Sequence, residues 1–170
     1  DIIPESFLFY PAKPEINETS AFETAFDLRA SKGASLGLSM PWILKPSDGG
    51  KGEGILIKES REDILSFLSS RPEGSIAWVV QEYIERPLLL EGQRKFDIRV
   101  WALLTFDYHI FVYSEGIIRT CSVPYTFSDL DDVFAHLSNH CIQEAHEAFG
   151  THESATNELD YVQFAAMFDS

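Results

Sequence analysis

Residues 42–57, with the sequence WILKPSDGGKGEGILI, place a glycine-dense segment between two apolar runs. The apolar runs predict two strands, and the spacing leaves no room for a helix between them. A loop of this kind can bring its N–H groups close around an anion, because glycine adopts backbone angles that other residues avoid. The stretch therefore predicts a strand–loop–strand unit suited to polyphosphate. It offers six candidate phosphate-binding residues: Lys45, Gly49, Gly50, Lys51, Gly52 and Gly54.

The spacing of these glycines excludes two common phosphate-binding motifs. A Walker A loop needs Gly-Lys-Ser/Thr at the start of a helix, and a dinucleotide-binding fingerprint needs a third glycine in register before a helix. Neither pattern accompanies Gly50 and Gly52. A mobile hairpin loop with incidental lysines is the alternative interpretation.

The charge of the chain restricts its partners. The 170 residues include 27 acidic and 13 basic side chains, which give a formal net charge of −14. Such a surface argues against nucleic acid and against an anionic membrane as direct partners, because both require a basic footprint. A small anionic ligand remains compatible with this charge if the few cations converge in one cleft.

The composition is that of a globular protein in a reducing compartment. Hydrophobic residues make up 45% and aromatic residues 13% of the chain, which is ample for a packed core. The two cysteines, Cys121 and Cys141, are too few for a disulfide framework and predict free thiols. No apolar run approaches the length of a membrane span, and residues 1–11 carry no pattern of a secretion signal. We expect a cytoplasmic protein.

Local patterns predict the elements of the first half of the chain. An apolar strand covers residues 7–10, a short helix residues 19–30, and a Gly/Ser-rich loop residues 31–39. After the glycine loop, Ser60 is the expected N-cap of a helix, with Asp63 at the third helical position of a capping box.

Three further elements are predicted later in the chain. Residues 76–84 form a β-rich apolar run. Residues 128–133 are expected to form a short acidic helical turn. Asn157 is expected to cap a last helix, with Asp160 at its third position.

Residues 95–106 predict the strand that carries the most chemistry. Side chains on a strand alternate between faces, so Lys95, Asp97 and Arg99 project together from one face. The opposite face, which begins with Phe96 and Ile98, is expected to be core. The charged row lies beside Trp101 on the same face, which suggests a cleft more than an open surface; a solvated edge is the alternative.

The returning chain adds one more cation to this sheet. Strands are expected at residues 109–113 and 117–121, with a tight hairpin turn at residues 114–117. Arg119 lies in the second of these strands and can therefore share a sheet with Lys95, Asp97 and Arg99.

From the residues alone, the chain predicts a nucleotide site between β-sheets. Lys45 and the loop amides would hold phosphates, and the segment Gln81, Glu82, Tyr83 and Ile84 suits an adenine through backbone hydrogen bonds and apolar packing. The mixed cluster of Lys95, Asp97, Arg99 and Arg119 could orient an anionic substrate, since Arg binds carboxylates bidentately.

A zinc site is an alternative function for the histidine-rich part of the sequence. Five possible ligands fall within a short stretch: His136, His140, Cys141, His146 and His152. Structural zinc uses closed four-ligand sets at recognisable spacing, and neither Cys-x-x-Cys nor His-Glu-x-x-His occurs. A nucleophilic Cys141–His140 pair is disfavoured because neighbouring residues on a strand point apart. We assign no residue as a metal ligand.

Several motifs in a fixed order carry a resemblance to a known family. They are WILKP at 42–46, the glycine loop 49–54, QEYI at 81–84, PLLL at 87–90, RKFDIR at 94–99, Glu115-Gly116 with Arg119, and HLSNHCIQ at 136–143. Together they resemble the tubulin tyrosine ligase-like family of the ATP-grasp superfamily over residues 42–168. Residues 4–7, PESF, also resemble the segment ahead of the family's glycine loop, whereas residues 12–40 match no motif.

The resemblance implies roles for individual residues. Lys45 and the glycine loop would contact ATP phosphates, and residues 81–84 the adenine. Three further residues would line the ATP site: His136, Ser138 and Asn139. Lys95 and Asp97 would lie at the nucleotide, while Arg99 and Arg119 would approach the acceptor carboxylate. Mg²⁺ would accompany ATP, with its acid and Asn ligands on a strand beyond the last helix expected here.

The resemblance also implies an architecture. We expect an α+β, ATP-grasp-type fold of antiparallel β-sheets with flanking helices, with its C-terminal part missing. Residues 1–41 would form an N-terminal segment with a linker or a gap, and residues 42–170 a partial ATP-grasp domain. Within it, residues 42–90 would carry the glycine loop and hinge, and residues 91–170 part of the C-terminal subdomain.

The implied function is that of an ATP-dependent carboxylate–amine ligase. Its partners would be ATP, a free amino acid, and a protein acceptor that offers a carboxylate, such as a tubulin tail. A chain at −14 would repel an acidic tail unless further segments are basic. The alternative is a catalytically weak or inactive domain that binds a protein partner in a larger assembly, such as a fungal RNA-decay body.

Overall fold

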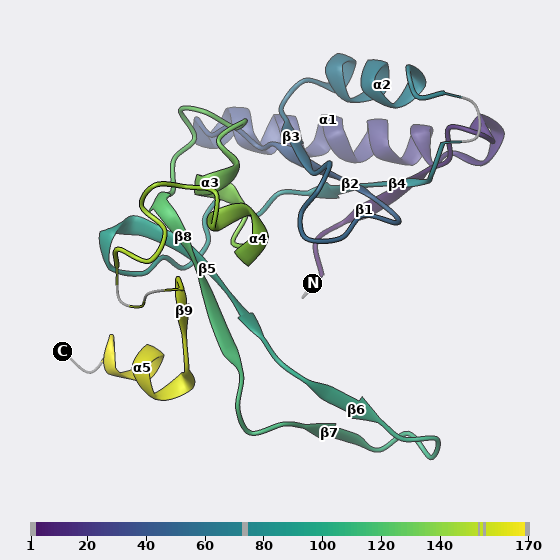
Figure 1. Cartoon of the computed structure of the whole chain (residues 1–170). Coiled ribbons are helices and arrows are strands. Elements are labelled where there is room, and N and C mark those ends of the chain that lie inside the picture. Colours follow the sequence, from purple (N-terminus) through teal and green to yellow (C-terminus); the bar gives the residue numbers. More distant parts are fainter. Residues whose placement is uncertain (1–2, 73–74, 153, 155, 169–170) are drawn as a thin grey trace. The chain divides into compact units, whose positions relative to one another are not determined.

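The computed structural model describes residues 3–72, 75–152, 154 and 156–168. The chain divides into two compact units, residues 1–86 and residues 87–170 (Figure 1). Both are mixed α/β structures built on antiparallel sheets with few helices, as expected for the fold class. In the part of the chain that the structure describes, no helix is long and apolar enough to cross a membrane.

The first unit is built on a four-stranded antiparallel sheet in the order β1-β4-β2-β3. The strands are β1 (Ser6–Phe9), β2 (Trp42–Pro46), β3 (Leu56–Lys58) and β4 (Trp78–Glu82). Leu44 lies opposite Leu56 on one side and Val80 on the other. The predicted strand–loop–strand unit is confirmed, and its first strand is central in the sheet.

Two helices, α1 (Thr19–Leu36) and α2 (Arg61–Ser69), cover one face of this sheet (Figure 1). Their buried side chains pack on alternate strand residues, and the core consists of Phe7, Phe9, Phe22, Ala25, Trp42, Leu44, Ile64, Leu68, Trp78 and Val80. Because strand residues alternate between faces, Ser6, Lys45 and Gln81 belong to the opposite face. The helices therefore provide stability while the other face keeps its polar side chains.

Helix α1 continues through residues for which a loop was predicted. It ends at Leu36, and Gly37 adopts a left-handed conformation with φ 63° that terminates the helix. A Cβ at Gly33 would lie 2.7 Å from the carbonyl oxygen of Leu38 and 2.8 Å from Cγ of Met40. The glycines that suggested a loop instead allow close packing and a helix end. In α2, the Ser60 hydroxyl accepts a hydrogen bond from the N–H of Asp63 at 3.2 Å, which confirms the predicted N-cap.

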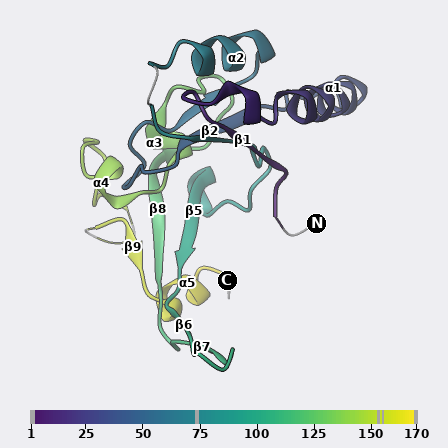
Figure 2. The ribbon, with the colours of Figure 1, turned by 90° about the vertical axis from the view of Figure 1, so that its right-hand side faces the viewer.

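The second unit contains a three-stranded antiparallel sheet, β5-β8-β9 (Figure 2). Its strands are β5 (Arg94–Arg99), β8 (Ile117–Pro124) and β9 (Glu158–Leu159). Short helices α3 (Val133–His136), α4 (His140–Gln143) and α5 (Tyr161–Ala166) follow β8 or β9. Two one-turn 3-10 helices complete the chain, η1 (Pro14–Ile16) in the first unit and η2 (Glu91–Gln93) in the second.

The stretch 95–106, which was predicted to form one strand, forms two. β6 (Ala102–Leu104) leaves the β5 sheet and pairs with β7 (Ile110–Val112) in a separate hairpin. The turn of this hairpin lies at residues 105–109, where the N–H of Tyr108 donates to the carbonyl of Thr105. The hairpin turn predicted at residues 114–117 is therefore wrong. Gly116 instead permits close packing, since a Cβ there would lie 2.6 Å from the carbonyl oxygen of Arg99.

The face expected to be core along this stretch is largely exposed. Ile98 is 50% exposed, and Val100 and Leu104 are similarly accessible. Phe96 is partly covered because its ring packs on Phe164 of α5, with centroids 5.1 Å apart. The alternation of side chains was predicted correctly, but alternation does not reveal how far a covering element extends.

Two helix starts also differ from the prediction. Asn157 has φ 54° and precedes β9, and its buried amide donates to the carbonyl of Thr120. The last helix is capped three residues later by Asp160, which forms a reciprocal capping box with Gln163. Likewise, the acidic residues 128–132 precede helix α3 instead of forming it.

Candidate functional site

Lys45 is held by a chain of polar side chains on the face of the first sheet that the helices leave uncovered. Its Nζ donates to Oε1 of Gln81 at 2.6 Å, and Nε2 of Gln81 donates to the hydroxyl of Ser6 at 2.7 Å. Partial burial lowers the pKa of Lys45, because it disfavours the charged ammonium. A half-buried cation whose recorded partner is a neutral amide can bind an anion. The sequence predicted Lys45 and Gln81 but missed Ser6.

The glycine loop follows Lys45 directly and offers N–H donors. Residues 49, 53 and 55 use their N–H groups in backbone hydrogen bonds of the loop. For Gly50, Lys51 and Gly52, no partner of the N–H is recorded among the described residues. Lys51 and Gly52 have positive φ of 59° and 89°, and the N–H of Glu53 donates to the carbonyl of Gly50, so these residues form a tight turn at the tip of the loop.

The segment predicted to receive adenine continues β4 beyond the sheet. The N–H of Tyr83 donates to the carbonyl of Pro41 at 3.1 Å, and the N–H of Glu82 to the carbonyl of Glu5 at 2.9 Å. The ring of Tyr83 is buried, whereas the side chain of Ile84 is exposed. The backbone of Tyr83 thus anchors the segment, and the side chain of Ile84 stays accessible beside it.

A second group of predicted residues lies in the second unit around Asp97. Arg119 lies opposite Asp97 in the β5–β8 pair, and its Nε and Nη2 donate to the two carboxylate oxygens at 2.9 Å each. The hydroxyl of Ser138 also donates to this carboxylate. Three donors from two different segments therefore fix Asp97. The structure thus brings Asp97 and Arg119 together, two of the residues that were predicted to form one cluster.

Lys95 lies on the same face of β5 and reaches the C-terminal end of α3. Its Nζ donates to the carbonyl of His136 at 3.0 Å and lies 5.9 Å from the centroid of the Tyr125 ring. The imidazole of His136 is buried, and its Nε2 lies 3.0 Å from the carbonyl oxygen of Asp129. Burial lowers the pKa of His136, so the ring favours the neutral form.

Two predicted residues are less tightly held. Arg99 at the end of β5 is exposed, and no ion pair is recorded for it within the described ranges. Asn139 precedes α4, where its carbonyl accepts from the N–H of Ile142 and Gln143. The predicted site residues thus form two groups, Lys45 with the loop and hinge in the first unit, and Lys95, Asp97, Arg119, His136 and Ser138 in the second.

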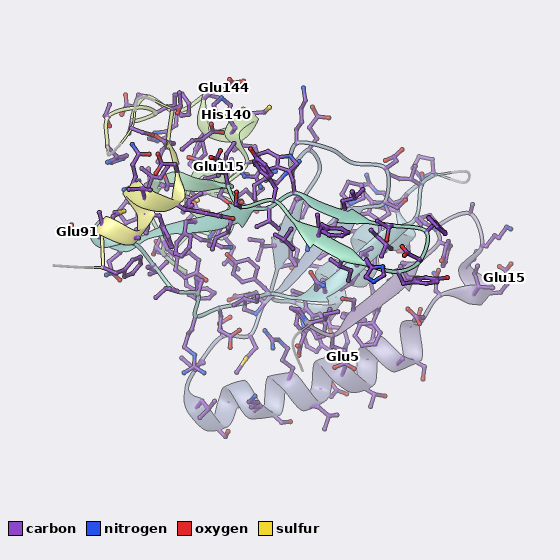
Figure 3. The ribbon with its side chains drawn as sticks, turned by 90° about the horizontal axis from the view of Figure 1, so that it is seen from below. Glu5, Glu15, Glu91, Glu115, His140 and Glu144 are labelled. Carbon is purple, nitrogen blue, oxygen red and sulfur yellow. The ribbon has the colours of Figure 1, made fainter. Side chains whose placement is uncertain are left out.

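The polar residues of the second unit do not assemble a metal site. No group of three or more His, Cys, Asp or Glu side chains is close enough to hold a metal ion in the part of the chain that the structure describes. Nε2 of His140 lies 3.7 Å from Oε2 of Glu144, and both residues are labelled in Figure 3. Nδ1 of His140 lies 3.1 Å from Oε1 of Glu158. Asp97 already accepts from Arg119 and Ser138. The described residues therefore supply no ligand set for Mg²⁺.

Comparison with known proteins supports the family resemblance carried by the sequence motifs. The profile of the tubulin-tyrosine ligase family matches residues 9–166, which include the segment 12–40 that carried no recognisable motif. Tubulin monoglycylase TTLL3 of Homo sapiens is 38% identical over 110 residues, which are 61% of this chain and 14% of that protein. Tubulin polyglutamylase ttll6 of Danio rerio is 35% identical over 113 residues, 64% of this chain and 13% of that protein.

A third relative aligns over more of the chain. Tubulin polyglutamylase ttll-11 of Caenorhabditis elegans is 30% identical over 154 residues, 87% of this chain and 20% of that protein. The chain therefore spans a fifth or less of the length of these three relatives. The family profile covers at least part of every element from β1 to α5. The chain therefore belongs to the tubulin-tyrosine ligase family.

Proposed function

We propose that this chain provides nucleotide-binding and acceptor-binding groups of an ATP-dependent ligase of the ATP-grasp type, which joins a free amino acid to a protein carboxylate. The observation that carries the proposal is the half-buried ammonium of Lys45, which precedes a loop with three consecutive N–H groups for which no partner is recorded among the described residues. Such a site suits a polyphosphate.

The reaction we propose has two balanced steps. A carboxylate oxygen of the acceptor attacks the terminal phosphorus of ATP, ADP leaves, and an acyl phosphate forms. The amine of the amino acid then attacks the acyl carbon, phosphate leaves, and an amide bond forms as the nitrogen loses a proton. Positioning and charge stabilisation account for most of the catalysis in phosphoryl transfer.

The residues of the second unit have chemistry that matches these steps. Arg99 is exposed and offers a planar donor fork to a carboxylate. Arg119 is partly engaged by Asp97 and keeps Nη1 as a donor toward the same acceptor. Lys95 and the Asp97 carboxylate would orient the nucleotide, with His136, Ser138 and Asn139 behind them. Mg²⁺ would enter the site bound to ATP, and we assign no described residue as its ligand.

The acceptor is proposed by chemistry and by the relatives. Those relatives are named as enzymes that glycylate or polyglutamylate tubulin, so an acidic protein segment is the acceptor class we infer. The net charge of −14 opposes long-range attraction of such a segment. Recognition would therefore depend on local cations such as Arg99 and not on the overall field.

Calorimetric titration with a non-hydrolysable ATP analogue and Mg²⁺ tests the proposal. We expect the chain to bind the analogue, and we expect Lys45→Ala to abolish measurable binding. Lys13→Ala is the matched control, because Lys13 is an exposed lysine of the same unit away from the loop. Equal binding by the chain and by Lys45→Ala, or no binding by the unchanged chain, would contradict the proposal.

A second candidate function is a protein-binding module without ligase activity. The β6–β7 hairpin favours it, because large apolar side chains such as Phe106, Tyr108 and Ile110 are exposed there. Failure of the chain to bind nucleotide, together with protein-partner binding that survives the double change Lys45→Ala and Asp97→Ala, would favour this function over the ligase.

A further inference from the structure

Arg29 of helix α1 connects that helix to the segment that follows β4. Its Nη1 donates to Oε1 of Glu82 at 3.1 Å, and its Nη2 donates both to the carbonyl of Tyr83 at 2.6 Å and to Oε2 of Glu85 at 3.1 Å. Three acceptors within four consecutive residues thus converge on one guanidinium. None of the motifs in the sequence points to this residue.

The surroundings of Arg29 make these contacts strong. Its side chain is only 11% exposed, and its Cζ lies 5.7 Å from the centroid of the buried Trp42 ring. The two carboxylates offset the charge of the guanidinium, and charge-assisted hydrogen bonds are stronger where water is excluded. A lysine could not reproduce this geometry, because an ammonium lacks the planar fork that reaches three acceptors at fixed angles.

The contacts determine the conformation of a segment that has no regular structure of its own. Tyr83 and Ile84 lie beyond the end of β4 and outside any helix. The N–H of Tyr83 is bound by Pro41 and its carbonyl by Arg29, so both backbone groups are held within the first unit. The exposed side chain of Ile84 therefore projects from a backbone that is already fixed before any ligand arrives.

We propose that Arg29 is a positioning residue for purine recognition: it holds residues 82–85 in the conformation that presents Ile84 to the base of the nucleotide. This inference rests on the proposed function, because it assumes that the segment meets the base of ATP. Preorganisation of this kind raises affinity by removing the entropic cost of ordering the segment upon binding.

Arg61 provides a matched control for a purely structural arginine. Its Nη1 donates to Oδ1 of Asp27 on α1 at 2.9 Å, and its Cζ lies 5.8 Å from the centroid of the Phe26 ring. Arg61 therefore also combines an acid on α1 with an aromatic ring. The contacts recorded for its side chain within the described residues do not include the segment 82–85.

The test compares two ligands that share the phosphates but differ in the base. Calorimetry measures the affinity of the chain and of Arg29→Met, Arg29→Lys and Arg61→Met for a non-hydrolysable ATP analogue and for inorganic tripolyphosphate, both with Mg²⁺. We expect Arg29→Met to weaken binding of the analogue by about tenfold, which corresponds to roughly 1.4 kcal/mol, because the segment must then be ordered when the ligand binds. Tripolyphosphate affinity should stay unchanged, Arg29→Lys should recover only part of the loss, and Arg61→Met should bind both ligands normally.

Each outcome separates this inference from the proposed function. Binding of the analogue that is unchanged in Arg29→Met overturns the inference and leaves the proposed function intact. An equal loss for both ligands shows a general structural role and also overturns it. If the unchanged chain binds neither ligand, both the inference and the proposed function are overturned. If it binds the analogue and tripolyphosphate with equal affinity, the base is not recognised and the inference about Arg29 is overturned.

Amide hydrogen exchange gives a second measurement that needs no ligand. In Arg29→Met we expect the exchange of the Tyr83 N–H to accelerate by about tenfold or more, because its segment loses the anchor that keeps it closed. The N–H of Val80 in the centre of the sheet should keep its protection. Acceleration at both positions would mean that the whole unit has loosened, and no change at Tyr83 would contradict the proposed positioning role.

Discussion

Replacing Asp97 by Asn and Arg119 by Met, singly and together, measures how strongly the second unit fixes its central carboxylate. The pair is bidentate, with both N–O distances at 2.9 Å, and it joins β5 to β8 at directly opposite positions. Each single change removes the attraction and leaves the other partner without its counter-charge. The double change removes both, so the difference isolates the coupling between the two side chains.

The expected magnitude follows from the burial of the two groups. Exposed ion pairs contribute roughly 0.2–1 kcal/mol, whereas breaking a buried pair costs about 3–5 kcal/mol. Arg119 is 23% and Asp97 34% exposed, which places the pair between these limits. We expect a coupling energy of about 1.5 kcal/mol, with Asp97→Asn the costlier single change because Ser138 also donates to that carboxylate.

Amide hydrogen exchange in β8 is the appropriate assay. The chain consists of two compact units, so a single denaturation curve would combine two transitions. Exchange reports the opening free energy of one segment, and a coupling of about 1.4 kcal/mol corresponds to a tenfold change in rate. The N–H of Ile118 is a suitable probe, because it lies in the paired part of β8 next to Arg119.

The pair Arg61–Asp27 supplies the control cycle. It has one hydrogen bond of 2.9 Å, and its side chains are 33% and 68% exposed. We expect its coupling to stay below about 0.5 kcal/mol. A coupling in the Asp97–Arg119 cycle no larger than in this control would refute the reasoning, since the carboxylate would then be free to change partners and would not be held in place for a ligand.

Three further predictions concern packing, pH and surface. Gly116→Ala should destabilise the second unit by more than about 2 kcal/mol, measured by hydrogen exchange, because a Cβ would lie 2.2 Å from Oη of Tyr161. Gly50→Ala is the control and should leave stability unchanged, because no atom lies within 4 Å of a Cβ built there. Burial lowers the pKa of His136, so the unfolded chain binds a proton near pH 6.5 that the folded unit resists. The stability of the second unit should therefore fall as the pH drops below 6.5, and His136→Gln should remove that slope in the opening free energy of β8 measured by hydrogen exchange at a series of pH values. Phe106→Asp at the exposed hairpin should reduce the fluorescence of a hydrophobic dye with unchanged unfolding temperature; an unchanged signal would show that the dye binds elsewhere.

Local chemistry predicted those parts of the structure that depend on neighbours in sequence. The glycine loop between two strands follows from composition alone, and the Ser60 cap follows from a hydroxyl three residues before an acid. The period-two pattern also placed Lys95 and Asp97 on one face of β5, where both now contact the segment 136–138. In each case the determining interaction spans few residues or repeats at a fixed period.

Contacts between distant segments limited the rest. Asn157 has the side chain of a helix cap, but its amide is used by Thr120, 37 residues earlier, and the helix begins after Asp160. The run 95–106 is uniformly β-forming, and only the pairing partners show that β5 and β6 belong to different sheets. Sequence patterns report what a residue favours locally, whereas these outcomes were decided by which other segment came to lie beside it.

The two faces of the first sheet explain why its candidate residues could be recognised at all. A shift of β2 by one residue would exchange Lys45 with Leu44, exposing core and burying a charge, so the apolar packing on α1 and α2 also fixes the position of the lysine. On stability alone an apolar side chain would serve better than a half-buried ammonium whose pKa is lowered by burial. Under the proposed function, the phosphates of the nucleotide would compensate this charge. The packing of β2 on α1 and α2 then determines where Lys45 lies, and the proposed ligand accounts for the residue type at that position.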